Sequence, residues 1–247
     1  MLFLRSLAFN IAFYTWTTFM VFAFLPALLG PARWVVRGQS LWAGGNLWLM
    51  KTLIGIDLEV RGRERIPPGP VIIASKHQSA WDTFVYHKLL DDLAIVLKKE
   101  LLRIPIYGSY CRKTKMIAVD RKGGSKALRA MLQAGREASA QGRPLLIFPE
   151  GTRTAPGTTR PYQPGAAAFY RDLKVPVVPV ALNSGLFWPR RRFLRRPGTI
   201  VLEFLEPIES GLDRKQFTAE LERRIEAGTQ ALVAEGLPPS SVDSGDI

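Results

Sequence analysis

VIIASKHQSAWD, residues 71–82, is a stretch in which an apolar run passes directly into polar and ionisable side chains. The run Val71-Ile72-Ile73-Ala74 has no alternating polar residues, which is typical of a strand in a sheet covered on both faces. The polar residues that follow therefore begin at the carboxyl end of a predicted strand. In α/β sheets, this is the edge that holds ligand-binding and catalytic groups.

The same kind of pattern recurs through the rest of the chain, where short β-branched runs alternate with helical stretches. We predict strands at residues 58–60, 71–75, 93–97, 116–119, 144–148, 177–182 and 199–205, and helices at 80–90, 125–141, 166–173 and 214–235. This alternation predicts a single α/β domain with a mixed, largely parallel sheet flanked by helices. The two prolines in the run 175–180 suggest an edge strand or an irregular functional wall, whereas its apolar composition favours plain core.

Composition narrows the classes of protein to which the chain can belong. The 247 residues include 34 Lys+Arg against 21 Asp+Glu, a formal net charge of +13, and 47% are hydrophobic. So apolar a chain is not disordered. One cysteine, Cys111, excludes a disulfide scaffold, and with only His77 and His87 beside it we expect no metal site. A chain that is both basic and hydrophobic is typical of proteins that bind one of two partners, nucleic acid or an anionic membrane.

The N-terminus favours the membrane. Residues 6–30 carry no charged side chain, and a membrane-spanning helix needs about 20 apolar residues. The alternatives are a cleaved signal peptide, whose apolar region is usually only about 7–15 residues long, and a buried core helix. In residues 33–55, Trp34, Trp42 and Trp48 recur about every seven residues among basic side chains. That pattern is typical of an interfacial helix, and an amphipathic helix packed on the domain is the alternative.

These features predict three parts of the chain. Residues 1–56 form a membrane-associated hairpin of two helices, with the second helix at the membrane surface. Residues 57–236 form the α/β domain. Residues 237–247, rich in Pro, Ser, Asp and Gly, form a disordered tail.

The first candidate catalytic group is the pair His77 and Asp82, five residues apart after the strand. A turn between them would bring the carboxylate to the imidazole, fix its tautomer and leave Nε2 free as a base. The chain has no G-x-S-x-G nucleophile motif. A base without an enzyme nucleophile suggests that a substrate hydroxyl attacks. Taken alone, the pair could equally be a surface histidine followed by a helix-capping aspartate.

Two further groups follow predicted strands. Residues 148–154, Phe-Pro-Glu-Gly-Thr-Arg-Thr, form a tight turn that exposes backbone N–H groups. Arg153 adds donors suited to a phosphate, and Glu150 could accept from a substrate hydroxyl. Arg121 closes the strand-end sequence 116–121, and Lys98 ends the strand before it. The alternative for the first turn is a solvated loop with a surface ion pair.

In this order, the motifs resemble those of the 1-acyl-sn-glycerol-3-phosphate O-acyltransferase family, the glycerolipid acyltransferases with an H-x-x-x-x-D motif. The matching segments are His77–Asp82, Val119-Asp120-Arg121, Phe148–Arg153 and Val177–Val180. The second match is the loosest, because Ala118 stands where the family often has a larger residue. The resemblance covers residues 58–207.

This resemblance implies transfer of a fatty acyl group from an acyl thioester to the sn-2 hydroxyl of lysophosphatidic acid, giving phosphatidic acid. It implies no metal, no cofactor and no covalent acyl-enzyme, with acyl-CoA or acyl carrier protein as co-substrate. His77 would be the general base and Asp82 its orienting partner. The substrate-binding residues implied are Arg121, Glu150, Gly151, Thr152 and Arg153 for the glycerol phosphate, Lys98 as a further phosphate contact, and Pro179 in the acyl groove. The alternative is an acyltransferase of the same family that acts on another lysolipid or on glycerol 3-phosphate.

Five arginines lie within residues 190–196. Such a run can bind nucleic acid, an anionic bilayer or an acidic carrier protein, or it can be a solvated loop. With a membrane hairpin in the same chain, we expect the bilayer surface and a membrane lipid acceptor as partners, with acyl carrier protein as a further candidate and no nucleic acid. The expected location is the cytoplasmic face of the inner or plasma membrane.

Overall fold

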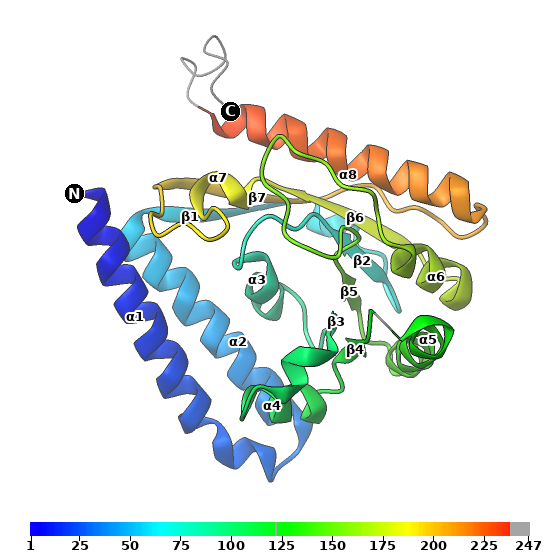
Figure 1. Ribbon diagram of the computed structural model, residues 1–247, viewed down its shortest axis with the longest axis horizontal. Coiled ribbons are helices and arrows are strands. Elements are labelled where there is room, and N and C mark those ends of the chain that lie inside the picture. The colour runs from blue at the N-terminus through cyan, green and yellow to red at the C-terminus, as the bar shows by residue number, and fades with distance from the viewer. Residues whose placement is uncertain (122, 238–247) are drawn as a thin grey trace.

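The structure is a computed structural model that describes residues 1–121 and 123–237 (Figure 1). All but the first residue of the predicted disordered tail lies outside the described residues. The strands are β1 (Ile56–Arg61), β2 (Ile72–Ser75), β3 (Ala94–Lys98), β4 (Ile117–Val119), β5 (Leu145–Ile147), β6 (Val177–Leu182) and β7 (Gly198–Phe204). The α-helices are α1 (Leu2–Ala23), α2 (Ala32–Leu49), α3 (Asp82–Leu89), α4 (Tyr107–Lys113), α5 (Gly124–Ala140), α6 (Pro164–Leu173), α7 (Ser184–Phe187) and α8 (Arg214–Gly236).

The strands form one seven-stranded sheet in the order β1-β7-β6-β2-β5-β3-β4. Every neighbouring pair is parallel except β6 and β7, so the predicted mixed, largely parallel sheet is confirmed. β6 lies inside the sheet, and the edge-strand alternative for its prolines is wrong. The carbonyl of Pro179 accepts from the N–H of Leu205. Proline has no N–H with which to donate a hydrogen bond in return. The β6–β7 ladder therefore ends at Pro179, and no hydrogen bond inside the ladder is lost.

Both faces of the sheet are covered, as the unbroken apolar run in β2 predicted. Ile73 packs in a buried cluster with α3 and the N-terminal helices. Its neighbours Ile72 and Ala74 point to the opposite face, where they join a cluster with α5, α6 and α8. Figure 1 shows α8 lying along one side of the sheet, with the α1–α2 pair at the far end from α5 and α6. Burial on both sides explains why the strand has no polar alternation.

The N-terminal helices form the predicted hairpin, and they lie side by side in Figure 1. The indole Nε1 of Trp16 donates to the carbonyl of Trp42 at 3.1 Å, and Nε1 of Trp42 donates to Thr17 Oγ1 at 3.0 Å. A Cβ at Gly45 would lie 2.4 Å from the Trp16 ring, so glycine permits this close approach. The Trp42 ring also contacts the Phe84 ring of α3, with centroids 5.4 Å apart. One face of α2 therefore packs on the α/β domain, as in the amphipathic alternative.

The outer face of the hairpin is exposed and apolar. Its exposed side chains are Phe3, Leu4, Leu7, Ile11, Tyr14, Phe19, Phe22, Trp34, Leu41 and Trp48. In the described part of the chain, α1 is the one helix long and apolar enough to cross a membrane, judged by length and composition. α2 carries its exposed tryptophans at the surface. These properties fit association with a membrane.

Two short helices, α4 and α7, were not predicted. α4 has seven residues, two of them glycine or serine, and no capping signal. Its position depends on a distant contact, because the hydroxyl of Tyr110 donates to the carbonyl of Val21 in α1 at 2.7 Å. Helices this short are marginal without tertiary packing, so the local sequence carries little signal for them.

The start of α8 offers a test of local stability. Asp213 Oδ1 accepts from the N–H of Gln216 at 2.8 Å, and Gln216 Oε1 accepts from the N–H of Asp213 at 3.2 Å, which together form a capping box. Asp213→Ala should lower the free energy of unfolding by about 1 kcal/mol, because the N–H of Gln216 loses its side-chain acceptor. Denaturant unfolding in detergent measures this. Gln230→Ala, exposed in the middle of the same helix, is the control, and equal stabilities of the two variants would contradict the prediction.

Candidate active site

The carboxyl ends of five parallel strands, β6, β2, β5, β3 and β4, meet at one edge of the sheet. β2 lies between β5 and β6, and it is followed by Lys76 and His77. The turn 148–153 follows β5, and Ser184 follows β6. Because these strands are neighbours, segments more than 100 residues apart in the sequence come together around His77.

His77 and Asp82 form the predicted pair. His77 Nδ1 lies 3.0 Å from Asp82 Oδ2, and the His77 side chain is 12% exposed while that of Asp82 is 0% exposed. The imidazole stacks on the Phe148 ring, with centroids 4.2 Å apart. The N–H of Thr154 donates to the His77 carbonyl at 2.8 Å. Asp82 and Phe148 therefore fix the ring, and Thr154 holds the backbone of His77.

The Asp82 carboxylate accepts from three further donors. Its Oδ2 accepts from the N–H groups of Gln78 at 2.6 Å and Ser79 at 2.8 Å, and its Oδ1 accepts from Ser184 Oγ at 2.6 Å. An ionised carboxylate can only accept, so in this arrangement His77 Nδ1 carries the proton and Nε2 has the free lone pair. No side chain of residues 1–121 or 123–237 bonds Nε2, so it is available to a ligand.

Glu150 faces the interior. Its Oε2 accepts from the N–H of His77 at 2.9 Å, and its Oε1 lies 2.9 Å from Lys76 Nζ. Lys76, 1% exposed, also donates to both carboxylate oxygens of Glu226 in α8 at 2.8 Å. Tyr162 completes the group by donating to Glu226 at 3.0 Å, and burial raises the pKa of its hydroxyl, so it keeps its proton. This geometry favours a role for Glu150 in positioning His77, and its predicted contact with a substrate hydroxyl stays a prediction.

A pocket of about 280 Å³ opens beside this group. Its lining includes Arg121, Glu150, Gly151 and Thr152, all predicted substrate-binding residues, together with Arg160, Pro161 and Gln163. Arg121 reaches across the pocket to donate to the Gly151 carbonyl. Gly151 has φ +66°, and a Cβ there would lie 3.0 Å from Gln163 and 3.5 Å from Arg121, so glycine suits this position.

The other predicted residues lie elsewhere. Burial lowers the pKa of the Arg153 guanidinium, Arg190 and Arg191 lower it further, and Asp82 acts in the opposite direction. Lys98 is exposed at the end of β3, and Pro179 is buried within β6. The second histidine, His87, is half-buried in α3, where burial lowers its pKa to about 4.

Metal ligands were not expected, and among the described residues no three His, Cys, Asp or Glu side chains gather into a possible metal site. Sequence reasoning missed several residues that surround the pair: Lys76, Gln78, Tyr162, Arg160, Ser184 and Glu226. Lys76 and Gln78 stand next to His77 and could have been noticed. Nothing local marks Ser184 or Glu226, which depend on the neighbouring strand and on α8.

The strand ends thus bring a histidine–aspartate pair and a pocket with two arginines together at one edge of an α/β sheet. A family model described as Acyltransferase matches residues 57–183. The 1-acyl-sn-glycerol-3-phosphate acyltransferase of Pseudomonas aeruginosa is 36% identical over 225 residues, which cover 91% of this chain and 87% of that protein. The alpha form from Mus musculus is 29% identical over 82% of this chain and 72% of its own length.

The fold is also shared with a solved structure. The crystal structure of the 1-acyl-sn-glycerophosphate (LPA) acyltransferase PlsC from Thermotoga maritima matches with a TM-score of 0.78 at 21% identity, over 96% of this chain and 100% of that one. The chain belongs to the 1-acyl-sn-glycerol-3-phosphate O-acyltransferase family. The resemblance drawn from its four motifs is confirmed.

Ser184 provides a test of the site geometry. Ser184→Ala removes the donor to Asp82 Oδ1 and leaves that buried oxygen unpaired, so the carboxylate can turn away from His77. We expect kcat for acyl transfer to fall about tenfold, with recovery in Ser184→Thr, which keeps the hydroxyl. Steady-state kinetics measure this, with the exposed Ser125→Ala as the control. Unchanged kcat in Ser184→Ala would show that the hydroxyl does not orient the pair.

Proposed function

We propose that this enzyme transfers a fatty acyl group from an acyl thioester to the sn-2 hydroxyl of lysophosphatidic acid, giving phosphatidic acid. The observation that carries the proposal is the 3.0 Å contact between His77 Nδ1 and Asp82, which leaves Nε2 without a partner among the described side chains. The names of the relatives, 1-acyl-sn-glycerol-3-phosphate acyltransferases, support the same acceptor. The donor in this proposal is acyl-CoA or acyl carrier protein.

In the proposed mechanism, His77 Nε2 takes the proton of the acceptor hydroxyl as its oxygen attacks the thioester carbonyl carbon. The tetrahedral intermediate collapses with loss of the thiolate, which takes the proton from His77. The ester bond forms as the thioester bond breaks, and no acyl-enzyme intervenes. Asp82 keeps the imidazole in the required tautomer and stabilises its charged form. No metal or cofactor takes part in this proposal.

In this proposal, the substrate is bound by the residues that the sequence predicted. Arg121, Gly151, Thr152 and Arg153 bind the glycerol phosphate through guanidinium and turn N–H donors. Glu150 acts mainly through the backbone of His77. Lys98 attracts the phosphate from its exposed position, and Pro179 shapes the acyl groove.

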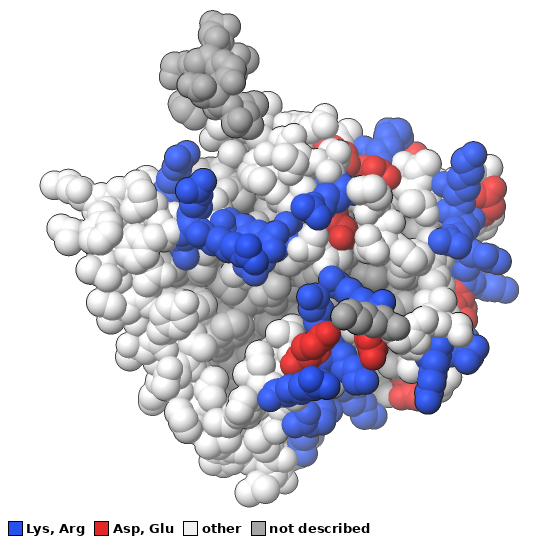
Figure 2. Space-filling view, in the orientation of Figure 1, with Lys and Arg blue, Asp and Glu red and all other residues white. Residues whose placement is uncertain are grey.

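The location in the proposal is the cytoplasmic face of the inner or plasma membrane, against an anionic bilayer, with no nucleic acid partner. Figure 2 shows lysine and arginine side chains on two rims of a hollow in one face of the molecule.

In the loop 190–196, Arg191, Arg192 and Arg196 are exposed together with Phe193 and Leu194. Arg195 differs from the expectation: it is 8% exposed, and its guanidinium lies 4.7 Å from the Trp188 ring centroid. Three exposed cations beside apolar residues suit a bilayer surface.

His77→Ala tests the base. The variant should fold and bind membranes normally, but its acyl transfer to lysophosphatidic acid should fall by about 10²–10⁴-fold, because no other group takes the hydroxyl proton. The assay uses purified enzyme, radiolabelled acyl-CoA or acyl carrier protein, and a panel of acceptors that includes glycerol 3-phosphate. His87→Ala is the matched control and should keep its turnover. Near-normal turnover in His77→Ala would reject the mechanism.

The arginine loop can be tested separately from catalysis. Replacing Arg192 and Arg196 by Ser should weaken binding to anionic vesicles about 30-fold, from about 1 kcal/mol for each basic residue near the surface. Flotation with anionic and neutral vesicles at low salt measures this. The control replaces Arg214 and Lys215, two exposed cations at the start of α8, by Ser. An equal effect in both variants would mean that the loop has no special role at the surface.

A further inference from the structure

Arg190 lies next to Arg153, although 37 residues separate them. Arg190 Nη1 donates to the carbonyl of Arg153 at 3.1 Å. The charge of Arg190 also lowers the pKa of the Arg153 guanidinium, after the larger effect of burial. The two cations are therefore held close together, one on the turn after β5 and the other on the loop before β7.

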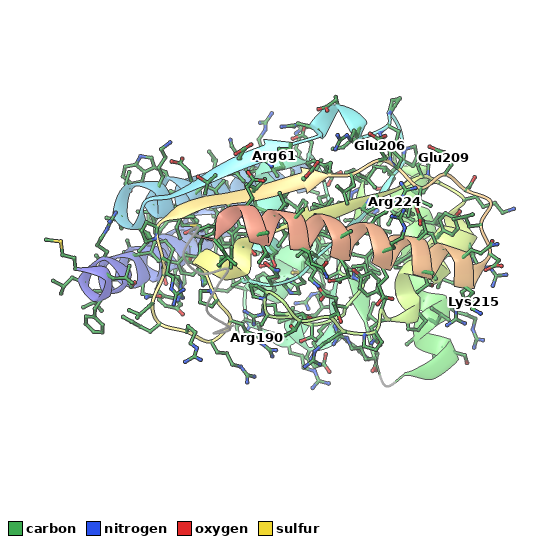
Figure 3. The ribbon with its side chains drawn as sticks, turned by 90° about the horizontal axis from the view of Figure 1, so that it is seen from above. Arg61, Arg190, Glu206, Glu209, Lys215 and Arg224 are labelled. Carbon is green, nitrogen blue, oxygen red and sulfur yellow. The ribbon has the colours of Figure 1, made fainter. Side chains whose placement is uncertain are left out.

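Neither guanidinium has an acidic partner. Within residues 1–121 and 123–237, no carboxylate lies within 4.0 Å of Arg153 or Arg190. Arg190 Nε is buried and bonds no group there. Arg61, by contrast, pairs with Glu235 at 2.6 Å, and Figure 3 shows Arg61 at the edge of the molecule opposite Arg190. Two neighbouring positive charges repel each other, and a buried N–H donor without a partner costs free energy. An anion bound between the two guanidinium groups offsets both effects.

The position of Arg153 and Arg190 relative to His77 suits the phosphate of the acceptor lipid. Arg153 is close enough to the catalytic pair for Asp82 to affect its pKa, and the next residue, Thr154, bonds the His77 carbonyl. In lysophosphatidic acid, the phosphate is attached to the carbon next to the one that carries the sn-2 hydroxyl. When that hydroxyl is at His77, the phosphate must be within a few bonds of it.

The loop that carries Arg190 also contacts the membrane-associated hairpin. The N–H of Arg195 donates to Ser6 Oγ at 3.0 Å, and the Phe193 ring packs on the Phe3 ring with centroids 5.1 Å apart. A lipid headgroup that leaves the bilayer beside α1 would therefore meet this loop on its way to His77.

On the basis of the proposed function, we propose that Arg190 is a specificity-determining residue that binds, together with Arg153, the phosphomonoester of the acceptor. A phosphomonoester carries a charge of about −1.5 to −2 at pH 7 and has three acceptor oxygens, which matches two guanidinium groups. A phosphodiester carries one charge and loses an acceptor oxygen to its second substituent. The pair therefore favours lysophosphatidic acid over lysolipids with a substituted phosphate.

The test compares Arg190→Gln with wild type in the full-length enzyme, in uncharged mixed micelles so that attraction to a charged surface plays no part. The acceptors are 1-acylglycerol 3-phosphate and a 1-acylglycerol phosphodiester, and glycerol 3-phosphate is used as a competing ligand. We expect kcat/KM for the monoester to fall about tenfold or more, mainly through KM. The KM of the acyl donor should not change, the preference for monoester over diester should shrink, and inhibition by glycerol 3-phosphate should weaken. Arg190→Lys should recover part of the preference.

Two variants serve as comparisons. Arg214→Gln, an exposed arginine at the start of α8, should behave as wild type. Arg160→Gln alters the pocket that Arg121, Gly151 and Thr152 line, so it should weaken binding of both acceptors equally and keep the monoester preference. Loss of the preference in Arg160→Gln but not in Arg190→Gln would assign the preference to that pocket and overturn the proposal.

An equal loss with both acceptors, or a raised donor KM, would show that Arg190 only supports the Arg153 turn, and it would also overturn the proposal. Failure of the proposed function would look different, because wild type itself would then not acylate the monoester.

Discussion

The Asp82 carboxylate is buried, and the site depends on the donors that compensate its charge. Taking an unpaired carboxylate out of water is costly, so a buried one must collect hydrogen bonds. Asp82 collects them from His77, from the N–H groups of Gln78 and Ser79, and from Ser184 on the neighbouring strand connection. These bonds fold the segment 77–82 back on itself and tie the end of β2 to the end of β6. The orientation of the imidazole follows from them.

A second buried ionic group lies behind the first. Lys76 lies between Glu150 and Glu226, and Glu150 also accepts from the backbone of His77. The turn after β5 and the long C-terminal helix are thus joined to Lys76, the residue before His77. Glu150 belongs to a motif that suggests a substrate contact, yet its side chain is 0% exposed. Removing one member of such a group leaves the others as unpaired buried charges, so the positions of these residues are strongly coupled.

The basic residues and the exposed hydrophobic residues lie on different parts of the molecule. Most of the exposed apolar residues lie on α1 and α2, while lysine and arginine side chains border a hollow in one face of the molecule (Figure 2). The loop 190–196 joins the two, because Phe193 and Arg195 contact α1 and Arg190 contacts the turn at Arg153. The proposal that the enzyme acts at a lipid surface rests on this arrangement more than on the net charge.

The sequence by itself determined the elements with strong local signals. The apolar run of β2 predicted a doubly covered sheet, all seven strands were located to within about two residues, and the motifs around His77, Arg121 and Glu150 identified the family. Only the tertiary structure decided which of these residues meet. It joined Ser184 to Asp82 and Glu226 to Lys76, buried Arg195 and turned Glu150 inward. It also placed Arg190 against the backbone of Arg153. Strands and motifs are encoded by local hydrophobic pattern and turn chemistry, whereas these contacts depend on which strand ends are neighbours in the sheet.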